Sequence, residues 1–135
     1  MSNSAKNFIV VIAVVVLTVG GAYLYGRYDK HMTAVSRESL EWPSVAGLVT
    51  HSNLEVHRSN VGAQSNKLRH RVDVEYEYVV DGRRYENDVV RFNQNNLSRK
   101  DKERLVSAHP VGRQVEVFYN PSDPAESVLV RGSYP

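Results

Sequence analysis

The sequence of 135 residues contains no cysteine. Disulfide bonds, thiolate catalysis and zinc sites with cysteine ligands are therefore excluded. A strong excess of charge is also missing, because 17 Lys and Arg residues are balanced by 15 Asp and Glu residues, giving a formal net charge of +2. Such balance provides no strong field to attract nucleic acid, and we expect no nucleic-acid partner. The sequence has no glycine-rich phosphate loop, and its length suits one folded domain.

Apolar residues are concentrated near the N-terminus. Residues 8–26, FIVVIAVVVLTVGGAYLYG, include no charged side chain. A helix of this length extends about 28 Å, close to the ~30 Å hydrocarbon core of a bilayer. Tyrosines and basic residues follow it, as they do at membrane interfaces. The run predicts a transmembrane helix at residues 8–26 in contact with the lipid bilayer, and hence a single-pass protein of the cell membrane.

A cleavable signal peptide is the alternative interpretation of this run. The segment TVGGAY offers small residues at a plausible cleavage site. Lys6 is the only basic side chain before the run, and the run continues past the site, which favours a retained anchor. Basic residues divide almost evenly between the two flanks, so the expectation of an extracytoplasmic domain follows only the usual behaviour of N-terminal signal anchors.

The chain is thus expected to consist of an N-terminal tail (1–7), a transmembrane helix (8–26), a juxtamembrane segment (27–41) and a small β domain (42–131). Residues 29–41 either continue the helix or form a stalk. The domain opens with an alternating strand at residues 47–57. One face of that strand carries Leu48, Thr50, Ser52, Leu54 and Val56, and the other carries Val49, His51, Asn53, Glu55 and His57.

The strongest local signal is a β-hairpin around Asp81-Gly82. This dipeptide favours a two-residue type I′ turn. The turn fixes a register that brings tyrosines and valines onto one face, so turn chemistry and apolar pattern agree. The expected pairs are Val80 with Arg83, Tyr78 with Tyr85, Tyr76 with Asn87, and Val74 with Val89.

The C-terminal part is predicted to contain one short helix and two strands. Ser98 is the expected N-cap of the helix, and Pro110 ends it. The strand RQVEVFY should stop at Asn120, because prolines at positions 121 and 124 cannot donate to a ladder. A last short strand, SVLV, then follows. The predicted fold class is mainly β: a small antiparallel β-sandwich or barrel of about five strands with one short helix.

Three motifs resemble the bacterial membrane-anchored domain-of-unknown-function family 3592. They are WPSVAGLVTHS, VEYEYVVDGRRYEND and PVGRQVEVFYNPSDPAESVL. They match, in order, the Trp-Pro, Tyr-x-Tyr-x-Val-x-Gly and Tyr-Asn-Pro-x-Asp-Pro hallmarks of that family, over roughly residues 42–129. The family is generally without an assigned reaction, so the resemblance implies a fold and a location more than a function.

The polar residues do not predict a catalytic or metal site. His51 and Glu55 on one strand are about 13 Å apart at ~3.3 Å per residue, so only Glu55 and His57 can share an ion, whereas zinc needs three or four ligands. Ser107 and His109 lack a glycine elbow and an oxyanion loop. We expect no catalytic, cofactor-binding or metal-binding residues and no cofactor.

Two further segments have alternative interpretations. The run SRKDKER is expected to be a solvated helix face, with lipid headgroup contact as the functional alternative. The aromatic residues Tyr76, Tyr78 and Tyr85 form either core or a binding strip, and the valines on their face favour core. The sequence predicts a membrane-anchored, non-catalytic interaction or scaffold module of the cell envelope with a protein partner at the membrane. The alternatives are a binding domain for a small ligand or envelope component, and a hydrolase accessory protein.

Overall fold

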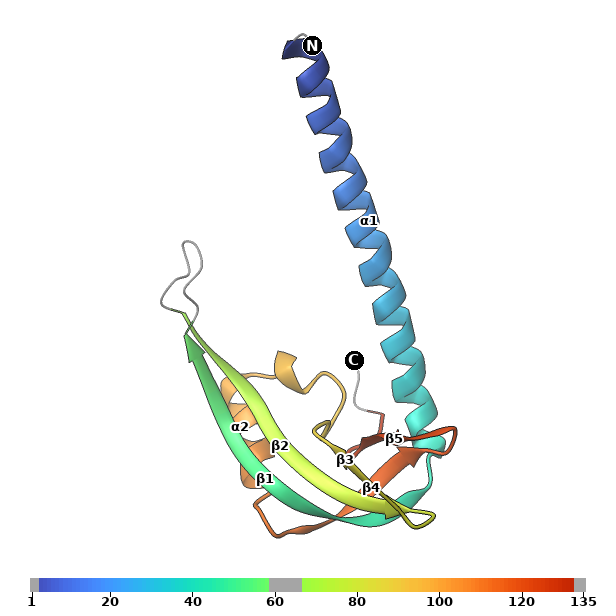
Figure 1. The fold of residues 1–135 in the computed structure, drawn as a ribbon. Helices are drawn as coiled ribbons and strands as arrows, with labels where there is room; N and C mark the ends of the chain where they lie inside the picture. The colour runs from blue at the N-terminus through green and yellow to red at the C-terminus, as the bar shows by residue number, and fades with distance from the viewer. Residues whose placement is uncertain (1–2, 59–66, 133–135) are drawn as a thin grey trace. The chain divides into compact units, whose positions relative to one another are not determined.

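The computed structural model describes residues 3–58 and 67–132, with only the backbone described for residues 3–12. The chain divides into two compact units, Met1–Val35 and Ser36–Pro135. The described part of the first unit belongs to helix α1, and the second unit contains the end of that helix and the sheet (Figure 1).

Helix α1 spans Asn3–Glu38 without interruption. It therefore continues through most of the predicted juxtamembrane segment and ends at a short 3₁₀ turn, η1 (Ser39–Glu41). Hydroxyl groups inside the helix bond back to it, as Thr18 Oγ1 does to the Val14 carbonyl oxygen at 3.1 Å. The predicted span at residues 8–26 lies within α1, and its side chains at residues 8–12 lie outside the described residues. Among the described residues, no helix combines the length and apolarity needed to cross a membrane.

The second unit is built on one five-stranded antiparallel sheet. Its strands are β1 (Ser44–Arg58), β2 (Leu68–Val80), β3 (Arg83–Asn87), β4 (Gln114–Asn120) and β5 (Asp123–Val128). The spatial order is β3-β2-β1-β4-β5. The long β1–β2 hairpin is strongly curved, and helix α2 (Arg99–Ser107) lies beside it (Figure 1). The predicted class, mainly β with about five antiparallel strands and a short helix, is confirmed.

The β2–β3 hairpin has the predicted turn and register. Asp81 and Gly82 both have positive φ, +49° and +78°, as a type I′ turn requires. Tyr78 is paired with Tyr85, and the other predicted pairs are present as far as Asn87. The predicted pairing of Val74 with Val89 is wrong, because β3 ends at Asn87, whose side-chain oxygen accepts the Asp88 N–H at 2.8 Å and turns the chain away.

Strand β1 contains a bulge that the sequence pattern did not predict. The register with β2 shifts between Val49 and His51, so Thr50 is the extra residue. A bulge reverses which side chains face the core. Val49 is consequently buried (1% exposed) whereas Leu48 is 38% exposed. The predicted two faces of residues 47–57 hold beyond the bulge, where Leu54 is partly buried, but are reversed before it.

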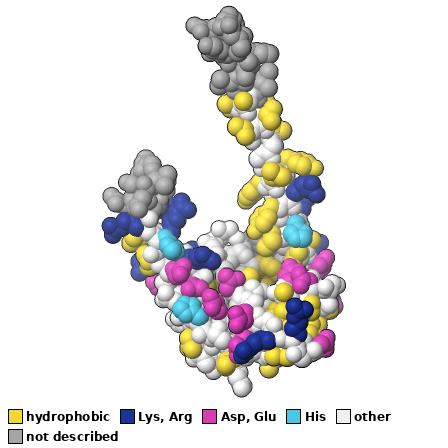
Figure 2. Space-filling model, in the orientation of Figure 1, with side chains coloured by type: hydrophobic (Ala, Val, Ile, Leu, Met, Phe, Trp, Pro, Cys, Tyr) yellow, Lys and Arg dark blue, Asp and Glu magenta, His cyan; other side chains and the backbone are white. Residues whose placement is uncertain are grey.

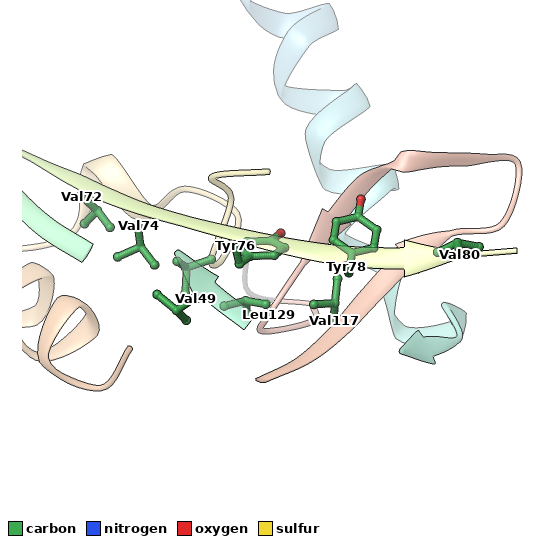
Figure 3. Close-up of a cluster of buried hydrophobic side chains, with 9 residues drawn as sticks. Val49, Val72, Val74, Tyr76, Tyr78, Val80, Val117 and Leu129 are labelled. Carbon is green, nitrogen blue, oxygen red and sulfur yellow. The ribbon is translucent and has the colours of Figure 1, made fainter. Parts of the chain in front are cut away.

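The core lies on one face of the sheet, where β2 contributes most of its members (Figure 3). Every second residue of β2 from Val72 to Val80 is buried, which confirms that the tyrosines of this strand belong to the core. The members of the core cluster are Val49, Val72, Val74, Tyr76, Tyr78, Val80, Val90, Val117 and Leu129.

The predicted helix cap and proline turn are both present. Ser98 Oγ accepts the Asp101 N–H at 3.2 Å and starts α2. Strand β4 ends at Asn120, whose side-chain oxygen accepts the Ser122 N–H at 2.9 Å. The last strand begins earlier than predicted, at Asp123 instead of Ser127, because Asp123 pairs directly with Asn120 across the turn.

Candidate functional site

The histidines and acids on the outer side of the β1–β2 hairpin form separate pairs. His51 Nε2 lies 3.0 Å from Asp73 Oδ2, and His57 Nε2 lies 3.0 Å from Glu55 Oε2. The hydrogen bond from His57 lowers the pKa of the Glu55 carboxyl. Within residues 3–58 and 67–132, no three His, Asp or Glu side chains are grouped as a metal site requires.

The Ser107 and His109 pair is not arranged as a nucleophile and base. His109 Nδ1 donates to the Leu105 carbonyl oxygen at 2.7 Å, so the ring closes the end of α2. Both residues are in the described part of the chain, and no hydrogen bond joins them there. The acids of β2 instead find basic partners, as when Arg84 contacts Glu77 at 2.8 Å.

A hydrogen-bonded chain of side chains connects β2 with the two edge strands. Asn87 Nδ2 on β3 donates to Ser127 Oγ on β5 at 3.0 Å. Ser127 Oγ lies 2.9 Å from the hydroxyl of Tyr76, which donates to the Val89 carbonyl oxygen at 2.8 Å. Tyr78 similarly donates to the Pro124 carbonyl oxygen of the proline turn. These contacts give the tyrosine hydroxyls a structural role.

Ionisation of Tyr76 is expected to unfold the domain at alkaline pH. Burial raises the pKa of this hydroxyl well above its ordinary value of 10.0. A raised folded-state pKa stabilises the fold fully below the unfolded-state pKa of about 10 and progressively less above it. Absorbance of tyrosinate, followed together with sheet content during alkaline titration, should show this residue ionising only as the sheet unfolds. In a Tyr76→Phe variant one fewer tyrosinate should form as the sheet unfolds, whereas tyrosinate formation at Tyr76 in an intact sheet would contradict the prediction.

A pocket of about 780 Å³ lies at the end of the β1–β2 hairpin. Its walls come from the end of β1, the start of β2, the loop containing η3 (Gln94–Asn96) and the first turn of α2. Lys and Arg side chains gather at this end of the hairpin, and acidic side chains lie further along it (Figure 2). The lining residues are His57, Lys67, Leu68, Arg69, His70, Arg71, Asn95, Leu97, Arg99 and Lys102.

The described residues that line the pocket are basic. They include five Lys or Arg residues, two histidines and no Asp or Glu. Arg99 is neutralised by Glu103 at 2.8 Å, and Arg71 has a longer contact of 3.9 Å with Asp88. The other three cations, Lys67, Arg69 and Lys102, have no carboxylate within 4.0 Å in the described part of the chain. The arrangement therefore presents uncompensated positive charge to whatever enters it.

Lys102 differs from the other basic residues of α2 because its side chain is buried. The residue is 8% exposed, and its ammonium group donates to the His70 carbonyl oxygen at 2.6 Å. The predicted solvated face of SRKDKER is therefore wrong at this position, although Arg99, Lys100 and Arg104 are exposed. The sequence did not predict this exception. Basic and acidic residues alternate around Lys102, and this pattern is the same whether the lysine bonds to a strand edge or is exposed to water.

Comparison with known proteins gives one match. A family model described as "Domain of unknown function (DUF3592)" matches residues 45–134. No curated protein and no solved structure matches the chain.

Proposed function

Because the chain belongs to the family of domains of unknown function DUF3592, we propose a function from its own residues. It is a membrane-anchored, non-catalytic interaction module of the cell envelope. The observation that carries the proposal is the uncharged run at residues 8–26, which lies within one continuous helix N-terminal to the folded unit. In this proposal the protein passes the membrane once, with its β domain on the extracytoplasmic side, where it contacts a protein partner.

The described side chains of α1 support anchoring. Apolar residues are exposed all around this part of the helix, with no polar stripe between them that would face water. Basic residues appear only where the apolar run ends, beginning with Arg27, which lies 5.9 Å from the Tyr23 ring centroid. The exposed apolar side chains are Val14, Val15, Val16, Leu17, Val19, Tyr23, Leu24, Tyr25 and Tyr28.

The non-catalytic part of the proposal is supported by how the reactive side chains are used. The histidines of β1 are each held by one carboxylate, and His109 is held by its own helix. The hydroxyls of the core residues Tyr76 and Tyr78 donate to backbone carbonyls. Each of these groups thus has a structural partner that accounts for its position.

We also propose that the sheet closes on itself as a small barrel. The edge strands β3 and β5 are brought together by Asn87, whose amide donates to the Ser127 carbonyl oxygen at 3.1 Å. The same amide lies 3.4 Å from the Ala125 carbonyl oxygen. Covering both edges protects them from pairing with other chains.

Anchoring predicts that alkaline carbonate leaves the full-length chain in the membrane pellet. Replacing Val16 and Leu17 with arginine, near the middle of the run, should move it to the supernatant. On insertion scales each arginine at a helix centre costs about 2.5–3.5 kcal/mol. A matched control replaces the exposed domain residues Val79 and Val111 with arginine and should stay in the pellet. Release of the unaltered chain by carbonate would refute the anchor.

A second function, binding of a small ligand or envelope component, is favoured by one observation. The basic pocket at the end of the β1–β2 hairpin contains cations without carboxylate partners among the described residues. A module of this kind would hold its ligand at the membrane without changing it chemically.

A further inference from the structure

We propose that the basic pocket binds a phosphate-bearing anion, with Lys102 as its buried contact. The inference rests on the second function above, ligand binding, and specifies the chemical class of the ligand. It concerns residues of the second unit only and is independent of the membrane anchor.

Lys102 supplies the observation that points to a ligand. The ammonium group of lysine has three hydrogen-bond donors, and the described residues satisfy one of them, through the His70 carbonyl oxygen. Lys102 as a whole is 8% exposed, and it lines the pocket. A largely buried ammonium group without an ion-pair partner is stabilised by an anion or by further acceptors. Because Lys102 lines the pocket, an anion inside the pocket is the compensation within reach.

The edge of strand β2 adds donors to the same place. Strand β3 pairs with β2 only from Tyr76 onward, so residues 68–75 of β2 lack a partner strand on that side. Side chains occupy part of this edge: Asn95 accepts the Val72 N–H at 3.2 Å, and Lys102 donates to His70. In an antiparallel strand the N–H and C=O of one residue point to the same edge. The His70 N–H is therefore directed to the side from which Lys102 approaches.

The charge of the pocket selects the class of ligand. Lys67, Arg69 and Lys102 bring three positive charges without ion-pair partners among the described residues, and Arg71 is only weakly engaged at 3.9 Å. A single carboxylate would balance one of them, whereas a phosphate monoester carries nearly two negative charges at neutral pH and three acceptor oxygens. Guanidinium groups such as those of Arg69 and Arg71 suit phosphate oxygens in a bidentate manner. Phosphate is thus the best match to this set of donors.

The test measures binding of pyrophosphate to the full-length chain in a non-ionic detergent by calorimetry, at constant ionic strength. We expect saturable binding that falls at least tenfold in Lys102→Met. The matched control is Lys100→Met, which removes the same charge from the same helix at an exposed position outside the pocket, and it should bind like the unaltered chain. If both variants lose pyrophosphate affinity equally, the binding depends on the overall surface charge and the proposed site is wrong.

A second pair of variants covers the case in which Lys102→Met does not fold. Arg69→Gln removes an exposed pocket cation and should weaken pyrophosphate binding several-fold. Arg83→Gln removes an exposed arginine from the far end of β2–β3 and should not. Unchanged binding in Arg69→Gln would contradict the proposal, because this residue is one of the three cations without a carboxylate partner.

Two ligand arms distinguish the sources of phosphate. Short-chain phosphatidic acid, compared with the matching phosphatidylcholine, tests a lipid headgroup, and pyrophosphate tests a free oligophosphate. Binding of either phosphate that depends on Lys102 supports the inference. If citrate binds as tightly as pyrophosphate, the assignment to phosphate is overturned. If pyrophosphate, phosphatidic acid and citrate all fail to bind, the site itself is overturned. Carbonate extraction tests the membrane anchor and does not depend on these binding results, so the two proposals can fail independently.

Discussion

Replacing Trp42 with alanine is expected to destabilise the β domain by about 3–5 kcal/mol, the usual cost of removing a buried tryptophan. The only tryptophan of the chain is 6% exposed. Its ring packs edge-on against Phe92, with centroids 6.3 Å apart at 66°. Trp42 also holds the entry to β1, since its N–H donates to the Ser39 carbonyl oxygen at 3.2 Å. The loss therefore removes packing at the junction of η1, β1 and the loop that follows β3.

Hydrogen exchange of the β2 and β4 amides in denaturant measures this change without interference from helix α1. Leu40→Ala is a suitable control, because Leu40 is a near neighbour in the same turn but is 54% exposed. It should change the free energy of unfolding by about 0.5 kcal/mol or less, as surface substitutions do. Trp42→Phe should retain part of the stability. A Trp42→Ala effect no larger than that of Leu40→Ala would show that the ring is dispensable.

The β2–β3 hairpin could be predicted in detail because its information is local. Asp81 and Gly82 determine a turn whose backbone twist allows one register, and the alternation on β2 independently selects the same face. The helix cap at Ser98 and the end of β4 at Asn120 are local in the same sense. Each depends on a side chain that bonds to the backbone within three residues.

The bulge in β1 could not be predicted because its cause is not local. Thr50 is the extra residue of the bulge. Strand β1 pairs with β4 only before Thr50, whereas it pairs with β2 on both sides of it. The hydroxyl of Thr50 donates to the Glu75 carbonyl oxygen at 3.3 Å, a contact with another strand. Strict alternation therefore placed Leu48 on the same face as Leu54 and Val49 on the opposite face, whereas the sheet turns Val49 and Leu54 inward and leaves Leu48 exposed.

The basic pocket escaped sequence reasoning for a similar reason. Its cations come from β2, the segment before it and α2, which are distant in sequence, and the acidic residues among them masked any local charge excess. Lys102 in particular follows Asp101 and precedes Glu103, a pattern typical of a solvated helix. Only the long β2 edge, left unpaired by the short strand β3, explains why a lysine is drawn inward. The sequence signal for an unpaired edge of β2 would be the difference in length between β2 and β3, the two strands of the β2–β3 hairpin.

Gly47→Ala is expected to destabilise the domain by about 3 kcal/mol, the upper end of the usual cost of overpacking. An added Cβ would lie 2.5 Å from Val117 Cγ2 and 2.8 Å from the Glu77 carbonyl oxygen. Gly47 is not among the glycines with positive φ, so the penalty comes from contact and not from backbone strain. The gain from a stiffer unfolded chain, about 0.4–1 kcal/mol, is too small to offset it.

Two companion variants identify the source of this penalty. Val117→Ala, added to Gly47→Ala, removes the side-chain clash but leaves the backbone clash with Glu77, since a carbonyl inside a paired strand cannot move away alone. The double variant should therefore recover only part of the lost stability, after subtraction of the cost of Val117→Ala itself. Ala46→Ser, at the exposed neighbouring position, should be nearly neutral. Full recovery in the double variant would mean that β1 and β2 separate easily here, whereas no loss in Gly47→Ala would mean that β1 does not lie this close to both neighbours.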